Sequence, residues 1–200
     1  MVEVKDPVLS FDEAKHEYRI DGQVVPSVTE IIAPLSDHSR VPAETLEFKR
    51  SLGKAVHKAI ELYEGADGLD MESLDLQALP YFEGWLKFKR ESRFQAEIVE
   101  RPYGSAKLRF AGTPDVIGSR TECFDELLDV KCTYAMEPAT GVQLAGYEIL
   151  LEENGIKIKR RGGVQLMPDG TFRYHEFKSR NDRIVFLSCL NLFNWKRNCK

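Results

Sequence analysis

Apolar residues recur every three or four positions between residues 43 and 64, the longest such pattern in the chain. This spacing puts their side chains on one side of a helix, so it predicts a long amphipathic helix facing the core. The apolar positions are Leu52, Ala55, Val56, Ala59, Ile60 and Tyr63. Shorter patterns of the same kind predict helices over about residues 76–93, 141–154 and 179–196.

The first 35 residues carry two local signals. Asp21 and Gly22 separate two strand-like segments within residues 8–25, and an Asp-Gly pair there predicts a β-hairpin. Ser27 precedes Glu30 by three residues, which is the spacing of a capping box. A short helix is therefore expected from about residue 28 to residue 34.

Strand-like patterns fill most of the second half of the chain. They cover residues 95–103, 107–110 leading into 116–117, 127–133, 163–167 and 171–177. With the helices, this order predicts an α/β fold: a central mixed β-sheet flanked by helices, with an N-terminal β-hairpin. A length of 200 residues predicts one domain. Its parts are an opening hairpin and helix (1–35), a helical region (43–95), a sheet with one helix (95–178) and a C-terminal helix (179–200).

Composition narrows the class of protein. No apolar run approaches the roughly 20 residues of a membrane span, and the N-terminus lacks the basic-then-apolar pattern of a signal peptide. The four cysteines form neither a CxxC pair nor a disulfide framework: Cys123, Cys132, Cys189 and Cys199. These features predict free thiols and a cytoplasmic protein with no membrane partner.

Charge is distributed unevenly around a net value of −4. Residues 1–154 hold 17 basic and 29 acidic residues, net −12, whereas residues 155–200 hold 11 basic and 3 acidic residues, net +8. Basic residues of the C-terminal part include Lys157, Lys159, Arg160, Arg161, Arg180, Arg183, Lys196 and Arg197. They would suit a track for a polyanion, because only local positive charge is needed there. The alternative is an ordinary solvated surface.

The most informative chemistry lies in residues 110–133. Asp129 and Lys131 are two apart in a strand-like run and therefore point to the same face. Asp115 precedes another apolar run, and the turn-rich residues 118–121 allow the two strands to lie side by side. Two carboxylates and one ammonium group at one sheet edge suit metal-dependent phosphodiester hydrolysis. Separately, each pattern also fits a turn aspartate or a surface ion pair.

Five further residues are candidates by position. His57 borders the apolar stripe and has Glu61 one helical turn later, so its imidazole could bind a cation such as Mn²⁺. Gln143 and Tyr147 share a helix face and could contact a phosphate or Lys131. Each of these residues alone also fits an ordinary polar helix position. Glu97, on a neighbouring strand, is a weaker candidate for supporting the site.

The motifs taken in order are more specific than any one of them. They are Gly53-xxx-His57, Gly112-xx-Asp115, Asp129-Val130-Lys131 and Gln143-xxx-Tyr147. This set resembles the PD-(D/E)xK nuclease superfamily, in particular its RecB-like exonuclease branch. Relatives in that branch include phage exonucleases, CRISPR-associated nucleases and mitochondrial genome maintenance exonucleases. Residues 18–32 also resemble the opening segment of the small phage-type and mitochondrial members.

The resemblance implies a restriction-endonuclease-like core with one or two bound Mg²⁺ or Mn²⁺ ions. It implies that His57, Asp115 and Asp129 are metal ligands. The carbonyl of Val130 would complete the metal shell, and Lys131 would position or activate the attacking water.

Gln143 and Tyr147 are implied as an accessory catalytic pair, and Glu61 occupies a further position of the family pattern. The CRISPR-associated branch carries an iron–sulfur cluster on four cysteines, three of them near the C-terminus. Only Cys189 and Cys199 lie there in this chain, so no iron–sulfur cluster is expected.

The implied activity is that of a divalent-metal-dependent deoxyribonuclease, and an exonuclease is favoured. Its substrate would be single- or double-stranded DNA, without sequence preference, in recombination, repair or processing of phage or bacterial DNA. A recombination or single-strand-binding protein is a possible partner. The alternatives are a non-catalytic DNA-binding or scaffold protein on the same fold and a structure- or site-specific endonuclease. The polarity of digestion and the oligomeric state stay open.

Overall fold

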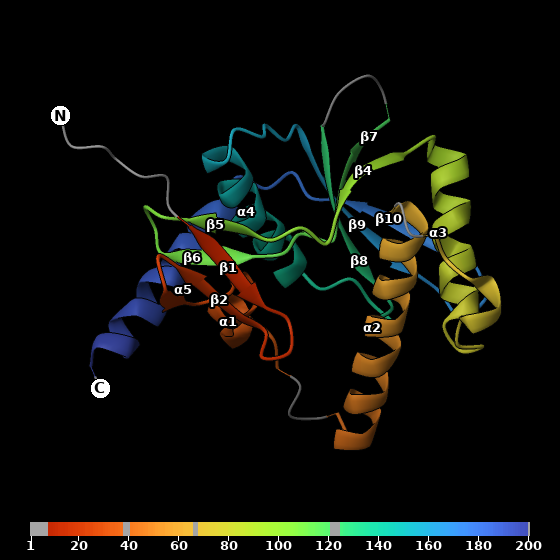
Figure 1. The fold of residues 1–200 in the computed structure, drawn as a ribbon, viewed down its shortest axis with the longest axis horizontal. Coiled ribbons are helices and arrows are strands. Elements are labelled where there is room, and N and C mark those ends of the chain that lie inside the picture. Colours follow the sequence, from red (N-terminus) through yellow and green to blue (C-terminus); the bar gives the residue numbers. More distant parts are fainter. Residues whose placement is uncertain (1–7, 38–40, 66–67, 121–124, 200) are drawn as a thin grey trace.

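A five-stranded mixed β-sheet lies at the centre of the fold (Figure 1). The computed structural model of the chain describes residues 8–37, 41–65, 68–120 and 125–199. In spatial order the strands are β10 (Phe172–Glu176), β9 (Arg160–Leu166), β8 (Glu126–Lys131), β7 (Val116–Ser119) and β4 (Gln95–Val99). β8 and β9 are parallel, whereas the other neighbouring pairs are antiparallel. The predicted mixed sheet is therefore confirmed.

Helices cover both faces of this sheet. α2 (Ala43–Glu64) and α3 (Leu79–Ser92) pack on one face. α1 (Val28–Ile32), α4 (Ala139–Glu153) and α5 (Asn181–Asn198) pack on the other. Two short 3₁₀ helices complete the set, Ala33–Leu35 and Met71–Ser73. The boundaries of α3, α4 and α5 lie within three residues of their predicted positions.

The strand β8 shows how alternation sorts side chains between the two layers. Leu128 and Val130 belong to the core under α2 and α3, whereas Leu127 belongs to the core under α4. Asp129 and Lys131 are offset from Leu127 by even numbers of residues and therefore face α4.

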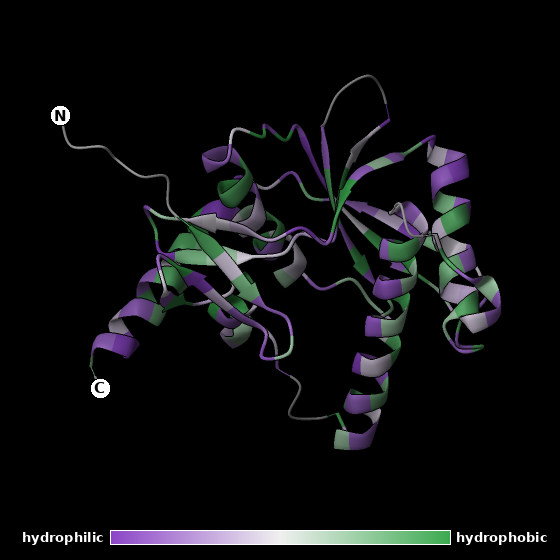
Figure 2. Cartoon of the chain, in the orientation of Figure 1, coloured by the Kyte–Doolittle hydropathy of each residue, from purple (hydrophilic) through white to green (hydrophobic). Residues whose placement is uncertain are grey.

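The long helix α2 follows its predicted pattern with one exception. Its buried residues are Leu52, Val56, Ala59 and Ile60, and Figure 2 shows hydrophobic and hydrophilic residues alternating along it. Tyr63, the last residue of the predicted stripe, is 44% exposed instead. It lies near the end of the helix, and its ring packs edge-on against Phe82 at the border of the core.

The N-terminal segment forms the expected hairpin, and a third strand extends it to a three-stranded antiparallel sheet. β2 (Glu17–Ile20) and β3 (Gln23–Val25) are the predicted hairpin strands, and β1 (Leu9–Asp12) pairs with β2 on its other side. Asp21 and Gly22 at the turn have φ of 52° and 77°, the left-handed conformation that a tight hairpin turn requires.

The capping box predicted for α1 is present and fixes the direction of the chain. Ser27 Oγ accepts a hydrogen bond from the Glu30 amide at 3.1 Å, and the Glu30 carboxylate accepts one from the Ser27 amide at 2.7 Å. Ser27 also bridges to Ala111, and Tyr18 Oη lies 2.8 Å from Thr113 Oγ1. These contacts tie the opening segment to the residues that lead into Asp115.

Two strand boundaries differ from the sequence-based expectation. The strand expected over residues 95–103 is divided into β4 and β5 (Tyr103–Ser105), because Glu100 adopts a φ of 47°. β5 pairs with β6 (Phe110–Gly112) in a separate two-stranded sheet. Of the turn expected over residues 118–121, Gly118 and Ser119 belong to β7, and residue 121 lies outside the described residues.

Three of the four cysteines belong to the described residues. Cys132, Cys189 and Cys199 are free thiols, as expected, and Cys123 lies outside the described part of the chain. Within that part, no helix has the length and apolar character needed to cross a bilayer.

Candidate metal centre

Two neighbouring strands bring the acidic residues together. β7 and β8 are antiparallel with Val116 opposite Leu128, so one more residue in this register sets Asp115 opposite Asp129. Oδ2 of Asp115 accepts a hydrogen bond from the Val130 amide at 2.7 Å. Both aspartates are buried, Asp129 completely. The two carboxylates therefore meet at one end of the sheet, as the alternation pattern predicted.

Helix α2 brings His57 to the same end of the sheet. Nε2 of His57 lies 3.0 Å from the Val130 carbonyl oxygen. Nδ1 lies 2.9 Å from Oε1 of Glu100 and 3.8 Å from Oδ1 of Asp115. The preceding residue, Val56, is fully buried in the core and anchors this turn of the helix. The imidazole thus connects the Asp129–Lys131 strand to two carboxylates.

Glu100 belongs to this cluster, although the sequence pattern did not single it out. It directly follows β4 in a left-handed backbone conformation, which is uncommon for a residue other than glycine. Its amide donates a hydrogen bond to the Asp115 carbonyl at 3.0 Å. Backbone strain of this kind tends to occur at functional sites, and here it accompanies a carboxylate in contact with His57.

Glu97, the acid that the pattern favoured on this strand, does not reach the cluster. The register of β4 shifts between Ala96 and Ile98, so Glu97 sits at a β-bulge. Ala96 packs against one core and Ile98 against the other, which interrupts the two-residue alternation. The Glu97 carboxylate accepts a hydrogen bond from Ser119 Oγ at 2.7 Å, at the far end of β7.

This difference gives a matched pair of variants. Glu100→Gln should weaken Mn²⁺ binding by roughly 10- to 100-fold, since it removes a charge from the cluster. Glu97→Gln should leave the affinity within about twofold, because its carboxylate is bonded elsewhere. Calorimetric titration with Mn²⁺ measures both. Equal affinities for the two variants would exclude Glu100 from the metal centre.

Lys131 starts a chain of polar contacts that runs along α4. Nζ lies 2.7 Å from both carboxylate oxygens of Asp129, and it donates to Oε1 of Gln143 at 3.4 Å. The Gln143 amide donates in turn to Tyr147 Oη at 3.3 Å. Gln143 and Tyr147 are buried. The structure thus brings together the helix pair and the lysine that the sequence had suggested as neighbours.

Burial and mutual charge shift the titration of these groups. Burial raises the pKa of Asp129 to about 6, against the opposing charge of Lys131. Burial also raises the pKa of Asp115, with His57 opposing it. Burial lowers the pKa of His57, but Asp115 and Glu100 outweigh it and raise the pKa to about 9. Likewise, Asp129 and Asp115 outweigh burial and raise the pKa of Lys131. At neutral pH the lysine is therefore an ammonium group.

The donor set fits a hard divalent cation. One ligand atom from each of His57, Glu100 and Asp115 lies within 4.8 Å of the others. Oδ2 of Asp129 is buried and makes no hydrogen bond to a described residue, although Lys131 Nζ is close. Carboxylate oxygens suit Mg²⁺, and imidazole with carboxylates suits Mn²⁺. An ion beside this buried oxygen would add a second positive partner to the Lys131 ammonium.

The structure does not bring Glu61 into the cluster. Its carboxylate is 39% exposed and accepts a hydrogen bond from Lys58 Nζ at 2.8 Å. Although Glu61 lies one turn after His57 on α2, this pair holds its side chain at the helix surface.

Part of the expected basic track is also engaged within the fold. Arg161 is buried and donates hydrogen bonds to the Gly141 and Ser179 carbonyls. Arg160 pairs with Asp125 at 3.0 Å. Arg161 therefore stabilises contacts between β9 and its surroundings, and the expectation that it contributes to a surface track is wrong. The Arg160 side chain is 36% exposed, so its part in such a track stays a prediction.

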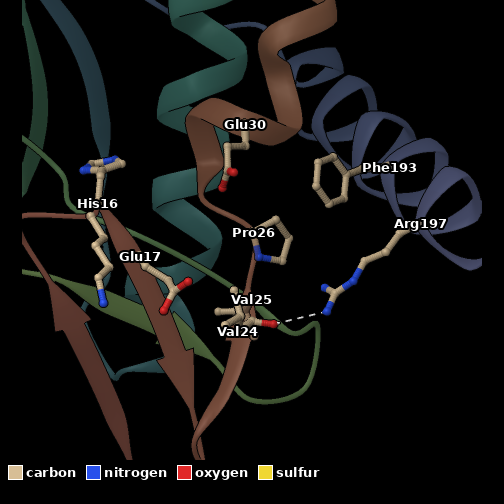
Figure 3. A pocket seen from close by; sticks show the side chains of 9 residues that line it. His16, Glu17, Val24, Val25, Pro26, Glu30, Phe193 and Arg197 are labelled. Carbon is tan, nitrogen blue, oxygen red and sulfur yellow. Dashed lines mark hydrogen bonds between the residues drawn. The ribbon is translucent and has the colours of Figure 1, made fainter. Parts of the chain in front are cut away.

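A cavity of about 360 Å³ lies away from the metal centre, between the N-terminal sheet and α5 (Figure 3). Its wall includes His16, Glu17 and Arg197, and Arg197 donates a hydrogen bond to the Val24 carbonyl at 3.3 Å. None of the predicted site residues lines it.

Comparison with known proteins finds similarity in structure only. No protein-family model and no curated protein matches the sequence. A candidate exonuclease from Eubacterium rectale has a TM-score of 0.51 at 11% identity, over 73% of this chain and 65% of that chain. The structure of LHK-Exo in complex with dAMP has a TM-score of 0.48 at 9% identity, over 88% of each chain. Another structure of this Laribacter hongkongensis alkaline exonuclease has a TM-score of 0.42 at 11% identity, over 86% of this chain and 92% of that chain.

The match to the Eubacterium rectale protein leaves about a third of that protein's length uncovered. At identities this low, structural similarity indicates a shared fold and not a shared activity. The structural match to this protein agrees with the central mixed sheet described above. The chain therefore shares its fold with that candidate exonuclease structure.

Proposed function

We propose that this protein is a divalent-metal-dependent deoxyribonuclease and that it acts as an exonuclease. The observation that carries the proposal is the convergence of His57, Glu100 and Asp115 beside the Asp129–Lys131 pair. Mg²⁺ or Mn²⁺ bound there would polarise a phosphodiester and lower the pKa of a bound water. The metal-binding residues would be His57, Asp115, Asp129 and Glu100, together with the Val130 carbonyl.

Lys131 would act as a hydrogen-bond donor to the scissile phosphate. Its raised pKa supports an ammonium group, which stabilises negative charge on phosphate oxygens and cannot accept a proton. Gln143 donates to Tyr147 and accepts from Lys131, so this pair would hold the ammonium in one orientation. Asp129 limits its movement from the other side.

The choice of DNA as substrate and of an exonuclease activity rests on the fold and on the ordered motifs. The fold is shared with a candidate exonuclease, and the ordered motifs resemble the RecB-like branch. The net charge of −4 gives no general attraction to nucleic acid, so binding would depend on local contacts.

Two labelled DNA substrates test the proposal. A linear oligonucleotide and a closed circle are incubated with Mg²⁺, with Mn²⁺ and with EDTA. Degradation of the linear substrate only, and only with a metal ion, is expected. Cleavage of the circle would favour an endonuclease. Binding without cleavage under any divalent ion would favour the non-catalytic alternative and overturn the proposal.

Gly53 gives a prediction that separates stability from activity. Glycine in a helix interior costs about 1 kcal/mol relative to alanine, yet a Cβ atom at Gly53 would meet no other part of the described structure within 4 Å. Gly53 lies one turn before His57 on the same side of α2. We expect DNA to occupy this open space. Gly53→Ala should then raise the free energy of unfolding by about 1 kcal/mol and lower cleavage by roughly 10- to 100-fold.

Denaturant unfolding and steady-state cleavage measure the two effects. Ser51→Ala, at an exposed position of the same helix, is the control and should leave cleavage unchanged. If Gly53→Ala were more stable and cleaved DNA like the wild type, the DNA would not pass over this turn.

A further inference from the structure

The loop that follows the Asp129–Lys131 strand presents one almost completely exposed aromatic ring. Tyr134 lies three residues after Lys131 and is 92% exposed. Within the described residues its side chain makes no hydrogen bond, ion pair or ring contact. Most other large apolar side chains of the chain are buried or half-buried. The ring therefore adds nothing to the packing of the fold.

The backbone beneath this ring is held firmly. Gln165 Nε2 donates hydrogen bonds to the carbonyls of Thr133 at 2.8 Å and Tyr134 at 2.7 Å. Gln165 is 1% exposed and is the register partner of Lys131 in the parallel β8–β9 pair. His175 Nε2 lies 3.1 Å from Gln165 Oε1 and completes the bonding of this amide.

Two further contacts fix the rest of the loop. Thr133 Oγ1 donates to the Ala135 carbonyl at 2.8 Å. Met136 packs so close to Gly163 that a Cβ atom there would come within 2.8 Å of its methyl group. Gln165 and Gly163 of β9 thus support the backbone of this loop, while the Tyr134 side chain points into solvent. Such support is unnecessary for a residue that only fills the surface.

The loop also begins at the wall of the metal centre. Cys132, two residues before Tyr134, belongs to the same core cluster as Leu52 and Val56 of α2. His57 follows Val56 directly. The loop that carries Tyr134 therefore starts directly after the site lysine and next to the helix that carries His57.

We propose that Tyr134 is a stacking platform for a base of the DNA strand next to the scissile phosphate, an inference that rests on the proposed nuclease function. Nucleic-acid bases stack on aromatic side chains without regard to sequence, because every base has a π-face. A ring on a firmly held backbone three residues after Lys131 would select strands whose bases are unpaired and available, such as single strands or frayed ends. Tyr134 would thus determine substrate preference and take no part in the chemistry.

The test compares Tyr134→Ala and Tyr134→Phe with the wild type on a single-stranded oligonucleotide. Loss of one stacked base should raise KM by roughly 5- to 150-fold, with kcat changed much less, while Tyr134→Phe keeps the wild-type KM. Melting temperatures should stay the same, because the ring is exposed. Trp195→Ala, at a 63% exposed aromatic residue on α5, is the matched control and should keep the wild-type KM.

A binding measurement separates this inference from the proposed function. Oligonucleotides with 2-aminopurine near their ends are titrated in Ca²⁺, and stacking quenches their fluorescence. Quenching by the wild type that is lost in Tyr134→Ala supports the platform, even if no cleavage is seen in Mg²⁺ or Mn²⁺. A wild type that cleaves, with a Tyr134→Ala variant unchanged in KM and quenching, would overturn the inference and leave the nuclease intact.

Discussion

Replacing Lys131 with methionine should lower kcat by roughly 10²- to 10³-fold, the usual effect of removing one donor that stabilises transition-state charge. The ammonium is held between Asp129 at 2.7 Å and Gln143 at 3.4 Å, which keeps it in one orientation at the site. Affinity for Mn²⁺ should not fall, because Lys131 is not among the ligands and removing its positive charge beside Asp129 favours binding of a cation. Single-turnover cleavage and calorimetric titration measure the two quantities.

Two controls accompany this variant. Lys58→Met removes a lysine from a surface pair with Glu61 and should leave kcat unchanged. Lys131→Met leaves the carboxylate of Asp129 buried without its cation, which destabilises a protein, so melting in Mn²⁺ must show that the variant is folded. A folded Lys131→Met variant with wild-type kcat would remove the lysine from the reaction.

Saturating Mn²⁺ should raise the melting temperature by roughly 5–10 °C. A ligand at 100 times its dissociation constant stabilises the folded state by about 2.7 kcal/mol, and 1 kcal/mol corresponds to roughly 2–4 °C in a chain of this size. The physical cause is the group of carboxylates from Asp115, Glu100 and Asp129, whose negative charge attracts the ion to the folded state. EDTA should reverse the shift.

Asp115→Asn should lose most of this stabilisation. Asparagine can still accept the hydrogen bond from the Val130 amide, so the local fold is kept while one negative charge is removed. Glu97→Gln should keep the full shift, because Glu97 is bonded to Ser119 at the far end of β7. An equal rise in melting temperature for the wild type, Asp115→Asn and Glu97→Gln would mean that Mn²⁺ binds elsewhere.

Local signals predicted much of this fold. The Asp21–Gly22 turn, the Ser27–Glu30 capping box and the α2 stripe each depend on residues close in sequence, and each is present. The juxtaposition of Asp115 and Asp129 could be predicted for a similar reason. Only a short link separates β7 from β8, and a two-residue alternation fixes which side chains share a face.

Residues whose position depends on an irregularity could not be predicted. Glu100 reaches His57 only because β4 carries a bulge at Glu97 and then turns through a left-handed residue. Neither feature has a distinctive residue type, since glycine is absent from both positions. The sequence therefore offered only Glu97 as a weak candidate on this strand, and its carboxylate lies at the other end of β7.

The burial of Arg161 illustrates a second limit. Its place in a basic run suggested an exposed side chain, but β9 is an interior strand and carries the residue beneath α4 and α5. There its charge is balanced by Asp182 at 3.3 Å and Glu148 at 3.6 Å. Glu148 lies on α4 and Asp182 on α5, and both are far from Arg161 in sequence, so a local count of charges could not reveal them.

A crystal of the protein grown with Mn²⁺ tests the central claim most directly, because anomalous scattering locates the ion without reference to activity. We predict a peak within about 2.5 Å of oxygen or nitrogen ligands from His57, Asp115, Glu100 and Asp129, with Lys131 next to it but not bound. A peak elsewhere, or none at this end of β7 and β8 at saturating Mn²⁺, would contradict the account.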